Sequence, residues 1–128
     1  MARYEHLPIY KKGMELTIYF EKIVRSFSRY RKHSLGSELR QKSREVVGSI
    51  TKANSTIERL KLLLEWGEKL EGLMVLIRIC KEVKAFSHFI NSYTYAANLL
   101  VELSGQNKGW IKSQREGHIT PAYDRLGI

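Results

Sequence analysis

Residues 8–27, PIYKKGMELTIYFEKIVRSF, show the pattern that decides the fold. Apolar side chains recur there at three- and four-residue steps, at Ile9, Leu16, Phe20, Ile23 and Phe27. Gly13 occupies the one gap in the series. This spacing places the apolar side chains on one face of a helix, whereas a half-buried strand would alternate every second residue. Pro8 suits the first turn of such a helix, where its missing N–H is not needed.

The same spacing recurs in three later stretches, at residues 39–53, 60–77 and 86–103. No proline lies between Pro8 and Pro121, and this permits long helices. The sequence therefore predicts an all-α fold. We expect four helices, of which the third is the longest, near residues 8–29, 35–53, 56–85 and 87–113.

Polar residues mark the expected connections. The basic stretch 29–34 interrupts the first apolar stripe, and Ser34 is predicted to cap the second helix. Ser55 and Glu58 form a capping-box pattern before the third helix, and Ser87 or a residue just before it can start the fourth. Short connections make consecutive helices antiparallel, so we expect an up-down-up-down four-helix bundle. This bundle forms one domain over residues 1–113, followed by a flexible tail over 114–128.

Cysteine content and hydropathy indicate the cellular compartment in which the protein is expected. Cys80 is the only cysteine, so neither an intrachain disulfide nor a cysteine-based zinc site can form, and its place on an apolar helix face predicts a buried core residue. The N-terminus lacks the apolar run of a signal peptide, and no stretch approaches the roughly 18 apolar residues of a membrane span. The expected location is cytoplasmic, without a membrane partner.

The sequence offers no catalytic constellation. The four histidines, at positions 6, 33, 88 and 118, are scattered and lack the spacing of a metal-binding helix. A di-metal bundle would need a glutamate three residues before His88, where Ala85 stands. Because nucleophile elbows and glycine-rich phosphate loops are also lacking, we expect a non-enzymatic protein with no metal and no cofactor.

Positive charge is concentrated near the start of the chain. The first 44 residues contain eleven basic and four acidic side chains, and so hold seven of the nine net positive charges. A one-sided positive field attracts polyanions, and nucleic acid would be bound through its backbone with low sequence specificity. The candidate contacts are Lys11, Lys12, Arg29, Arg31, Lys32, Arg40 and Arg44. A solvated basic face and an acidic protein partner are the alternatives.

Two tryptophan regions are candidates for contacts with other molecules. Lys108 and Lys112 flank Trp110 near the end of the fourth helix; this tryptophan can close the core, contact a subunit or stack on a base. The third helix carries more apolar residues than one core needs. Its residues predicted to face a neighbouring subunit are Leu62, Trp66, Leu73 and Ile79. With Trp110, the first three form the predicted oligomer interface.

Four short motifs resemble a known family. They are LPIYKK at 7–12, FSRY at 27–30, LGSELR at 35–40 and Gly109-Trp110, and the resemblance spans about residues 4–113. In this order and spacing they resemble the Avd family, the accessory variability determinants of diversity-generating retroelements. That family belongs to a wider group of four-helix proteins, which includes those encoded by intervening sequences in bacterial 23S ribosomal RNA genes. Ser28 departs from the pattern, which has proline at that position.

The resemblance implies a function that composition alone does not. Avd proteins form pentameric rings and associate with the retroelement's reverse transcriptase and its template-repeat RNA, with DNA as a further candidate partner. The complex makes cDNA with errors at adenines, which rewrites a variable gene region; Avd itself is not the polymerase. On this resemblance, the basic residues above, with Lys108 and Lys112, become candidate contacts for RNA or for the reverse transcriptase. The alternative is another RNA-linked role within the ribosomal intervening-sequence group.

Overall fold

The computed structural model describes residues 7–54, 59–86 and 89–116, whose regular secondary structure is helical with no strand. The four long helices are α1 (Pro8–Val24), α3 (Ser37–Asn54), α4 (Arg59–Glu82) and α5 (Phe89–Arg115). A short helix α2 (Arg29–Arg31) and a π-helical segment η2 (Lys32–Gly36) precede α3. The predicted all-α class is confirmed.

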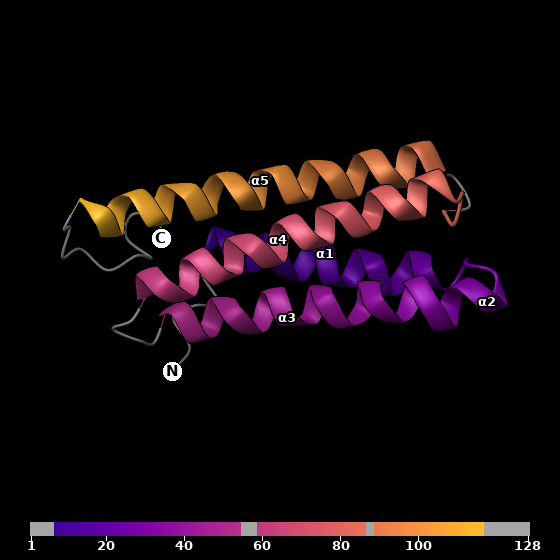
Figure 1. Ribbon diagram of the computed structural model, residues 1–128, viewed down its shortest axis with the longest axis horizontal. Coiled ribbons are helices and arrows are strands. Elements are labelled where there is room, and N and C mark those ends of the chain that lie inside the picture. The colour runs from indigo at the N-terminus through magenta and orange to yellow at the C-terminus, as the bar shows by residue number, and fades with distance from the viewer. Residues whose placement is uncertain (1–6, 55–58, 87–88, 117–128) are drawn as a thin grey trace.

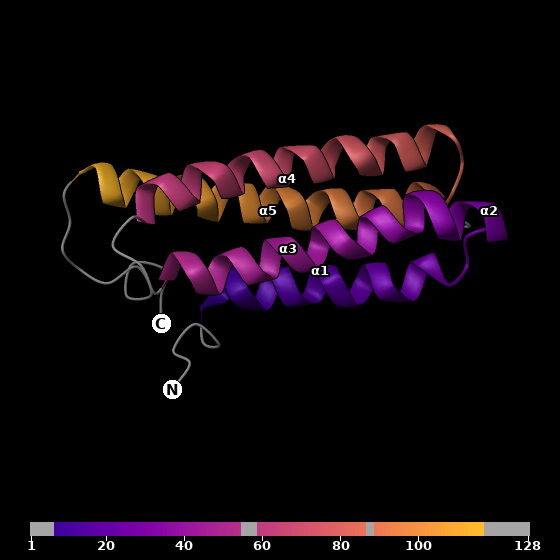
Figure 2. The same ribbon diagram turned by 60° about the horizontal axis from the view of Figure 1, so that its bottom comes forward.

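The long helices form an antiparallel bundle, as predicted (Figures 1 and 2). α1 packs against α3 and α5, and α4 packs against the same two helices. α1 and α4 are therefore diagonal partners, so their outer faces point away from opposite sides of the bundle.

Side-chain hydrogen bonds to the backbone, two of them buried and one partly buried, join neighbouring helices. Thr17 Oγ1 on α1 donates to the Ser43 carbonyl on α3 at 3.1 Å. Trp66 Nε1 on α4 donates to the Val46 carbonyl on α3 at 2.9 Å. Asn107 Nδ2 on α5 donates to the Leu63 carbonyl on α4 at 3.0 Å. Because an unsatisfied buried polar group is costly, these bonds favour one register between the helices.

The first helix ends earlier than residue 29. α1 stops at Val24, and the chain turns over residues 25–28 before helix resumes at Arg29. Ser28, not Ser34, caps the new helical segment, because its Oγ accepts a hydrogen bond from the Arg31 N–H at 3.4 Å. Ser34 lies inside η2, where its hydroxyl donates to the Tyr30 carbonyl at 3.1 Å. The predicted cap at Ser34 is therefore wrong.

Several other boundaries differ from the predictions. α5 has 27 residues and α4 has 24, so within the described ranges the longest helix is the last rather than the third. α5 extends to Arg115, two residues into the predicted tail, and the rest of that tail from 117 lies outside the described residues. The capping signals at Ser55, Glu58 and Ser87 also lie outside them. None of the helices that the structure describes has the length and apolar character to cross a bilayer.

Candidate nucleic-acid interface

Two connections distant in sequence lie at the same end of the bundle. In Figure 1 this is the end that carries α2, where the chain also passes from α4 to α5. Residues 25–38 of the first connection contain four cations and one carboxylate, and residues 81–86 of the second contain two cations and one carboxylate. We call this region the basic end. Its cations are Arg25, Arg29, Arg31, Lys32, Lys81 and Lys84.

Aromatic packing holds the two connections together. Phe27 and Phe86 are buried and meet edge to face, with ring centroids 5.7 Å apart. Such a pair adds about 0.5–1.5 kcal/mol to the gain from burial alone. The turn at residues 25–28 thus has a physical cause, because it lets Phe27 enter the core beside the second connection.

Lys84 is displayed by an unusual backbone conformation. Its φ of 57° lies in the left-handed region, which costs a non-glycine residue about 1–2 kcal/mol. The conformation closes the end of α4: the Lys84 N–H donates to the Lys81 carbonyl at 3.0 Å, and the Ala85 N–H donates to the Cys80 carbonyl at 2.8 Å. The Lys84 side chain is exposed.

The cations of the basic end have few acidic neighbours. Arg29 and Lys84 are exposed, and neither forms an ion pair within the described part of the chain. The Arg31 guanidinium lies 5.7 Å from the Tyr30 ring centroid, and Lys81 Nζ lies 4.8 Å from that of Tyr93. These contacts leave the positive charges available to an anion, because an aromatic ring does not neutralise them.

Arg40 and Arg44 have a different environment from the one predicted. Both are directed at Glu21 on α1: Arg44 Nη2 lies 2.6 Å from Oε2, and Arg40 Nε lies 3.2 Å from Oε1. The Arg40 contact is an ion pair without hydrogen-bond geometry. The two arginines therefore link α3 to α1, and one carboxylate offsets part of their charge.

Lys12 likewise forms ion pairs with carboxylates of the bundle itself. Its Nζ lies 3.2 Å from Glu102 on α5 and 3.5 Å from Glu15 on its own helix. The hydrogen bond with Glu102, together with the charges of both glutamates, raises the pKa of Lys12. Lys12 thus joins α1 to α5.

The remaining predicted cations lie at the other end. Lys11 is on the first turns of α1, and Lys108 and Lys112 are on the last turns of α5; all three are exposed. α1 has 17 residues, so its length separates the two ends by about 25 Å. The structure therefore does not gather the predicted set into one surface, although Arg29, Arg31 and Lys32 stay together.

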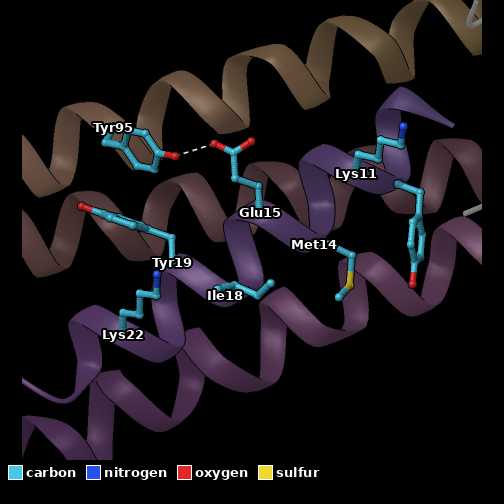
Figure 3. A pocket seen from close by; sticks show the side chains of 8 residues that line it. Lys11, Met14, Glu15, Ile18, Tyr19, Lys22 and Tyr95 are labelled. Atoms are coloured by element: carbon cyan, nitrogen blue, oxygen red, sulfur yellow. Dashed lines mark hydrogen bonds between the residues drawn. The ribbon is translucent and has the colours of Figure 1, made fainter. Parts of the chain in front are cut away.

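A groove follows the outer face of α1 (Figure 3). Its volume is about 510 Å³, and Met14 and the 48% exposed Ile18 give it an apolar floor. Lys11 and Lys22 stand toward its two ends. The rings of Tyr19 and Tyr95 lie 4.5 Å apart along one side. The α1 groove is therefore mainly apolar, with a lysine toward each end and the Glu15 carboxylate between them beside Tyr95.

The predicted orientation of the oligomer-interface residues is wrong for three of the four. Trp66, Leu73 and Trp110 are buried in the core, and Leu62 is half-buried and packs against it. Because α4 carries apolar residues on most of its sides, their spacing in the sequence did not determine which side of the helix faces the core. Trp66 and Leu73 face inward along with Leu63, Leu70 and Cys80.

A different set of α4 residues faces outward. Val75 is 53% exposed and Ile79, which the sequence did place outward, is 44% exposed; Leu64 is exposed as well. Exposed carboxylates follow the same three- and four-residue steps along the helix. We call this set the α4 stripe: Leu64, Glu68, Glu71, Val75, Ile79 and Glu82.

The burial of Cys80 is confirmed, and desolvation raises the pKa of its thiol to about 11. Over the ranges that the structure describes, no three His, Cys, Asp or Glu side chains come together as a metal site.

Sequence reasoning missed Lys81 and Lys84 because the charges of residues 45–85 nearly balance. The signal that could have found them is topological. An up-down bundle places its first and third connections at the same end, so the cations of both belong to one surface.

Comparison with protein-family models, curated proteins and solved structures found no match for this chain.

Proposed function

We propose that this protein is a non-enzymatic, cytoplasmic accessory factor that binds RNA at the basic end of its bundle. The observation that carries the proposal is that two connections distant in sequence lie at one end of the bundle and together hold six cations and only two carboxylates. A polyanion gains from such a surface by releasing counterions, and this gain falls as salt rises.

The shape of the basic end favours contacts to the backbone of the nucleic acid. The end consists of helix termini and turns, rather than an exposed helix of the kind that reads a DNA groove. Arginine grips phosphate with two parallel hydrogen bonds and lysine acts as a point charge, so neither distinguishes bases in this role. Binding should therefore depend weakly on sequence.

The resemblance to the Avd family indicates which RNA the protein binds. On that basis we propose that the RNA is the template-repeat RNA of a diversity-generating retroelement. The protein would hold this RNA together with the reverse transcriptase during mutagenic cDNA synthesis. If a reverse transcriptase is encoded beside this protein, co-purification with it, with and without the template RNA, tests this part. Failure to associate in both cases would favour another RNA-linked role.

A matched pair of variants tests the binding site. Arg29→Glu/Lys84→Glu changes one exposed cation in each connection, whereas Lys61→Glu/Arg115→Glu changes one lysine and one arginine at the opposite end. Each substitution replaces a positive by a negative charge, so both variants lower the formal net charge from +9 to +5. We expect the first to weaken RNA binding at least tenfold in a mobility-shift assay, and the second to have a much smaller effect.

A third variant, Lys108→Glu/Lys112→Glu, tests the flank of Trp110. If this variant loses more RNA affinity than Arg29→Glu/Lys84→Glu, the RNA site lies at the end of α5 and not at the basic end. Helical content measured by circular dichroism should stay unchanged in all three variants, because the replaced side chains are exposed.

We further propose that the chain assembles head to tail into a ring, with five subunits as the resemblance implies. The α1 groove is mainly apolar and carries two lysines against one glutamate, whereas the α4 stripe carries three apolar side chains and three carboxylates. The two faces lie on opposite sides of the bundle. When the groove of one subunit contacts the stripe of the next, a row of subunits has one unpaired groove at one end and one unpaired stripe at the other. Closing the row into a ring pairs these two faces as well. The α4 stripe thus replaces Trp66, Leu73 and Trp110 as the proposed interface.

Substitutions on the two faces test the assembly. Ile18→Asp in the α1 groove and Val75→Asp in the α4 stripe should each disrupt it, because both bury a charge in an apolar contact. Val101→Asp is the control, since Val101 is 62% exposed on α5 and lies outside both faces. Light scattering should give about 75 kDa, five times the 14.9 kDa of one chain, for the parent and the control. A parent protein of single-chain mass would contradict the ring.

A further inference from the structure

Tyr30 is an exposed aromatic residue in the first connection of the basic end, between Arg29 and Arg31. Its relative exposure is 74%, the highest among the large hydrophobic residues in the described part of the chain. The neighbouring Phe27 and Phe86 do the packing at this end, so Tyr30 has no part in the core. A single exposed apolar residue is common on protein surfaces, so exposure alone does not indicate a partner. What distinguishes Tyr30 is its position between Arg29 and Arg31.

The backbone beneath Tyr30 is held by several hydrogen bonds. The Lys32 N–H donates to the Ser28 carbonyl at 2.9 Å, and Ser34 Oγ donates to the Tyr30 carbonyl at 3.1 Å. With the Ser28 cap, these bonds fix the turn in which Tyr30 lies. The ring therefore stands on an ordered support, and fewer degrees of freedom are lost when a ligand binds it.

The charges around the ring fit a nucleotide. The Arg31 guanidinium lies 5.7 Å from the ring centroid, and Arg29 and Lys32 flank Tyr30 along the chain. Single-stranded nucleic acid is bound in this way elsewhere, with a base stacked on an aromatic ring and cations on the adjoining phosphates. A duplex cannot stack so, because its bases are already stacked on one another.

We propose that Tyr30 stacks on an unpaired base of single-stranded RNA held at the basic end. This inference rests on the proposed function and adds the class of ligand, which is an unpaired rather than a duplex segment. The alternative, insertion of the ring into a pocket of a protein partner, requires no difference between single-stranded and duplex RNA.

The test compares Tyr30→Ala and Tyr30→Phe on an unstructured single-stranded RNA and a duplex RNA of equal length. Tyr30→Ala should weaken single-strand binding about tenfold, the loss expected for one stacked base, and leave duplex binding unchanged. Tyr30→Phe keeps the stacking face and should bind both RNAs like the parent protein. An equal loss for both RNAs in Tyr30→Ala, or none for either, would overturn the stacking role.

Arg29→Glu/Lys84→Glu, assayed on the same two RNAs, separates failure of this inference from failure of the proposed function. We expect that variant to weaken both ligands, because backbone charge is common to them. If it does so while Tyr30→Ala leaves single-strand binding unchanged, only the stacking role is lost. If it changes neither, the basic end is not the RNA site and both proposals fall. Reduced association of Tyr30→Ala with the reverse transcriptase, without reduced single-strand binding, would assign the ring to a protein pocket.

Discussion

At the scale of single residues, Glu15 joins two helices through its carboxylate. It accepts a hydrogen bond from the Tyr95 hydroxyl on α5 and forms an ion pair with Lys12 on α1. The hydrogen bond from Tyr95, aided by the charge of Lys12, lowers the pKa of Glu15 below its ordinary value of 4.5. The same hydrogen bond raises the pKa of Tyr95 above its ordinary value of 10.0.

This pair predicts a pH dependence of stability. A lowered carboxyl pKa contributes stability that is full above pH 4.5 and is lost as pH falls through the folded-state pKa. A raised tyrosine pKa contributes stability that is full below pH 10.0 and is lost as pH rises through its folded-state value. The free energy of unfolding of the parent should therefore exceed that of Tyr95→Phe between these limits, and the difference should shrink at either extreme.

Urea unfolding of both proteins across the pH range measures this difference. Tyr30→Phe serves as the control, because no carboxylate accepts a hydrogen bond from Tyr30 in the described part of the chain. It should match the parent throughout the acid range. A difference between the parent and Tyr95→Phe that stays constant from neutral to strongly acid pH would contradict the Glu15–Tyr95 hydrogen bond.

At the scale of elements, η2 lies tightly against the end of α1. Gly36 is buried, and a Cβ at this position would lie 2.6 Å from Val24 Cγ1 and 3.3 Å from the Arg31 carbonyl oxygen. A glycine is thus required for the close approach of the two segments. The turn, the cap at Ser28 and the π-helical segment together bring the chain back onto α1, where Gly36 meets Val24.

Gly36→Ala should therefore destabilise the protein. The added methyl group overpacks the contact with Val24, which typically costs about 1–3 kcal/mol in the free energy of unfolding. Gly48→Ala is the matched control: Gly48 lies in α3, and a Cβ added there would meet nothing within 4 Å, so alanine should stabilise the helix by about 1 kcal/mol. Thermal or urea unfolding reports both, and an unchanged midpoint for Gly36→Ala would show that η2 can move away from α1.

A helix was predictable from the sequence where it has a single apolar face and that face is buried in the core. The apolar stripe at Leu16 and Phe20, and the one at Val46 and Ile50, predicted their helices because those residues are indeed buried. The rotation of α4 was not predictable, because Trp66 and Leu64 are equally apolar and differ only in which neighbours they meet. The turn at residues 25–28 was missed as well, since its cause is the contact of Phe27 with Phe86, almost 60 residues away in sequence.

At the scale of the whole molecule, topology decides which charges act together. The sequence identified Arg29, Arg31 and Lys32 as candidates from local charge density. It could not show that Arg40 and Arg44 meet Glu21, because that contact joins two helices. Local charge in the sequence therefore indicates a polyanion partner, whereas the location of the surface depends on the packing of the bundle.

The salt dependence of RNA affinity for Arg29→Glu/Lys84→Glu and Lys61→Glu/Arg115→Glu tests most directly whether RNA phosphates contact the basic end. Each lost contact to a single strand lowers the slope of log affinity against log salt by about 0.7, so the first variant should lose about 1.4. The second variant should keep the slope of the parent protein. Equal reductions in both variants would show that net charge alone attracts the RNA, and would contradict a site at the basic end.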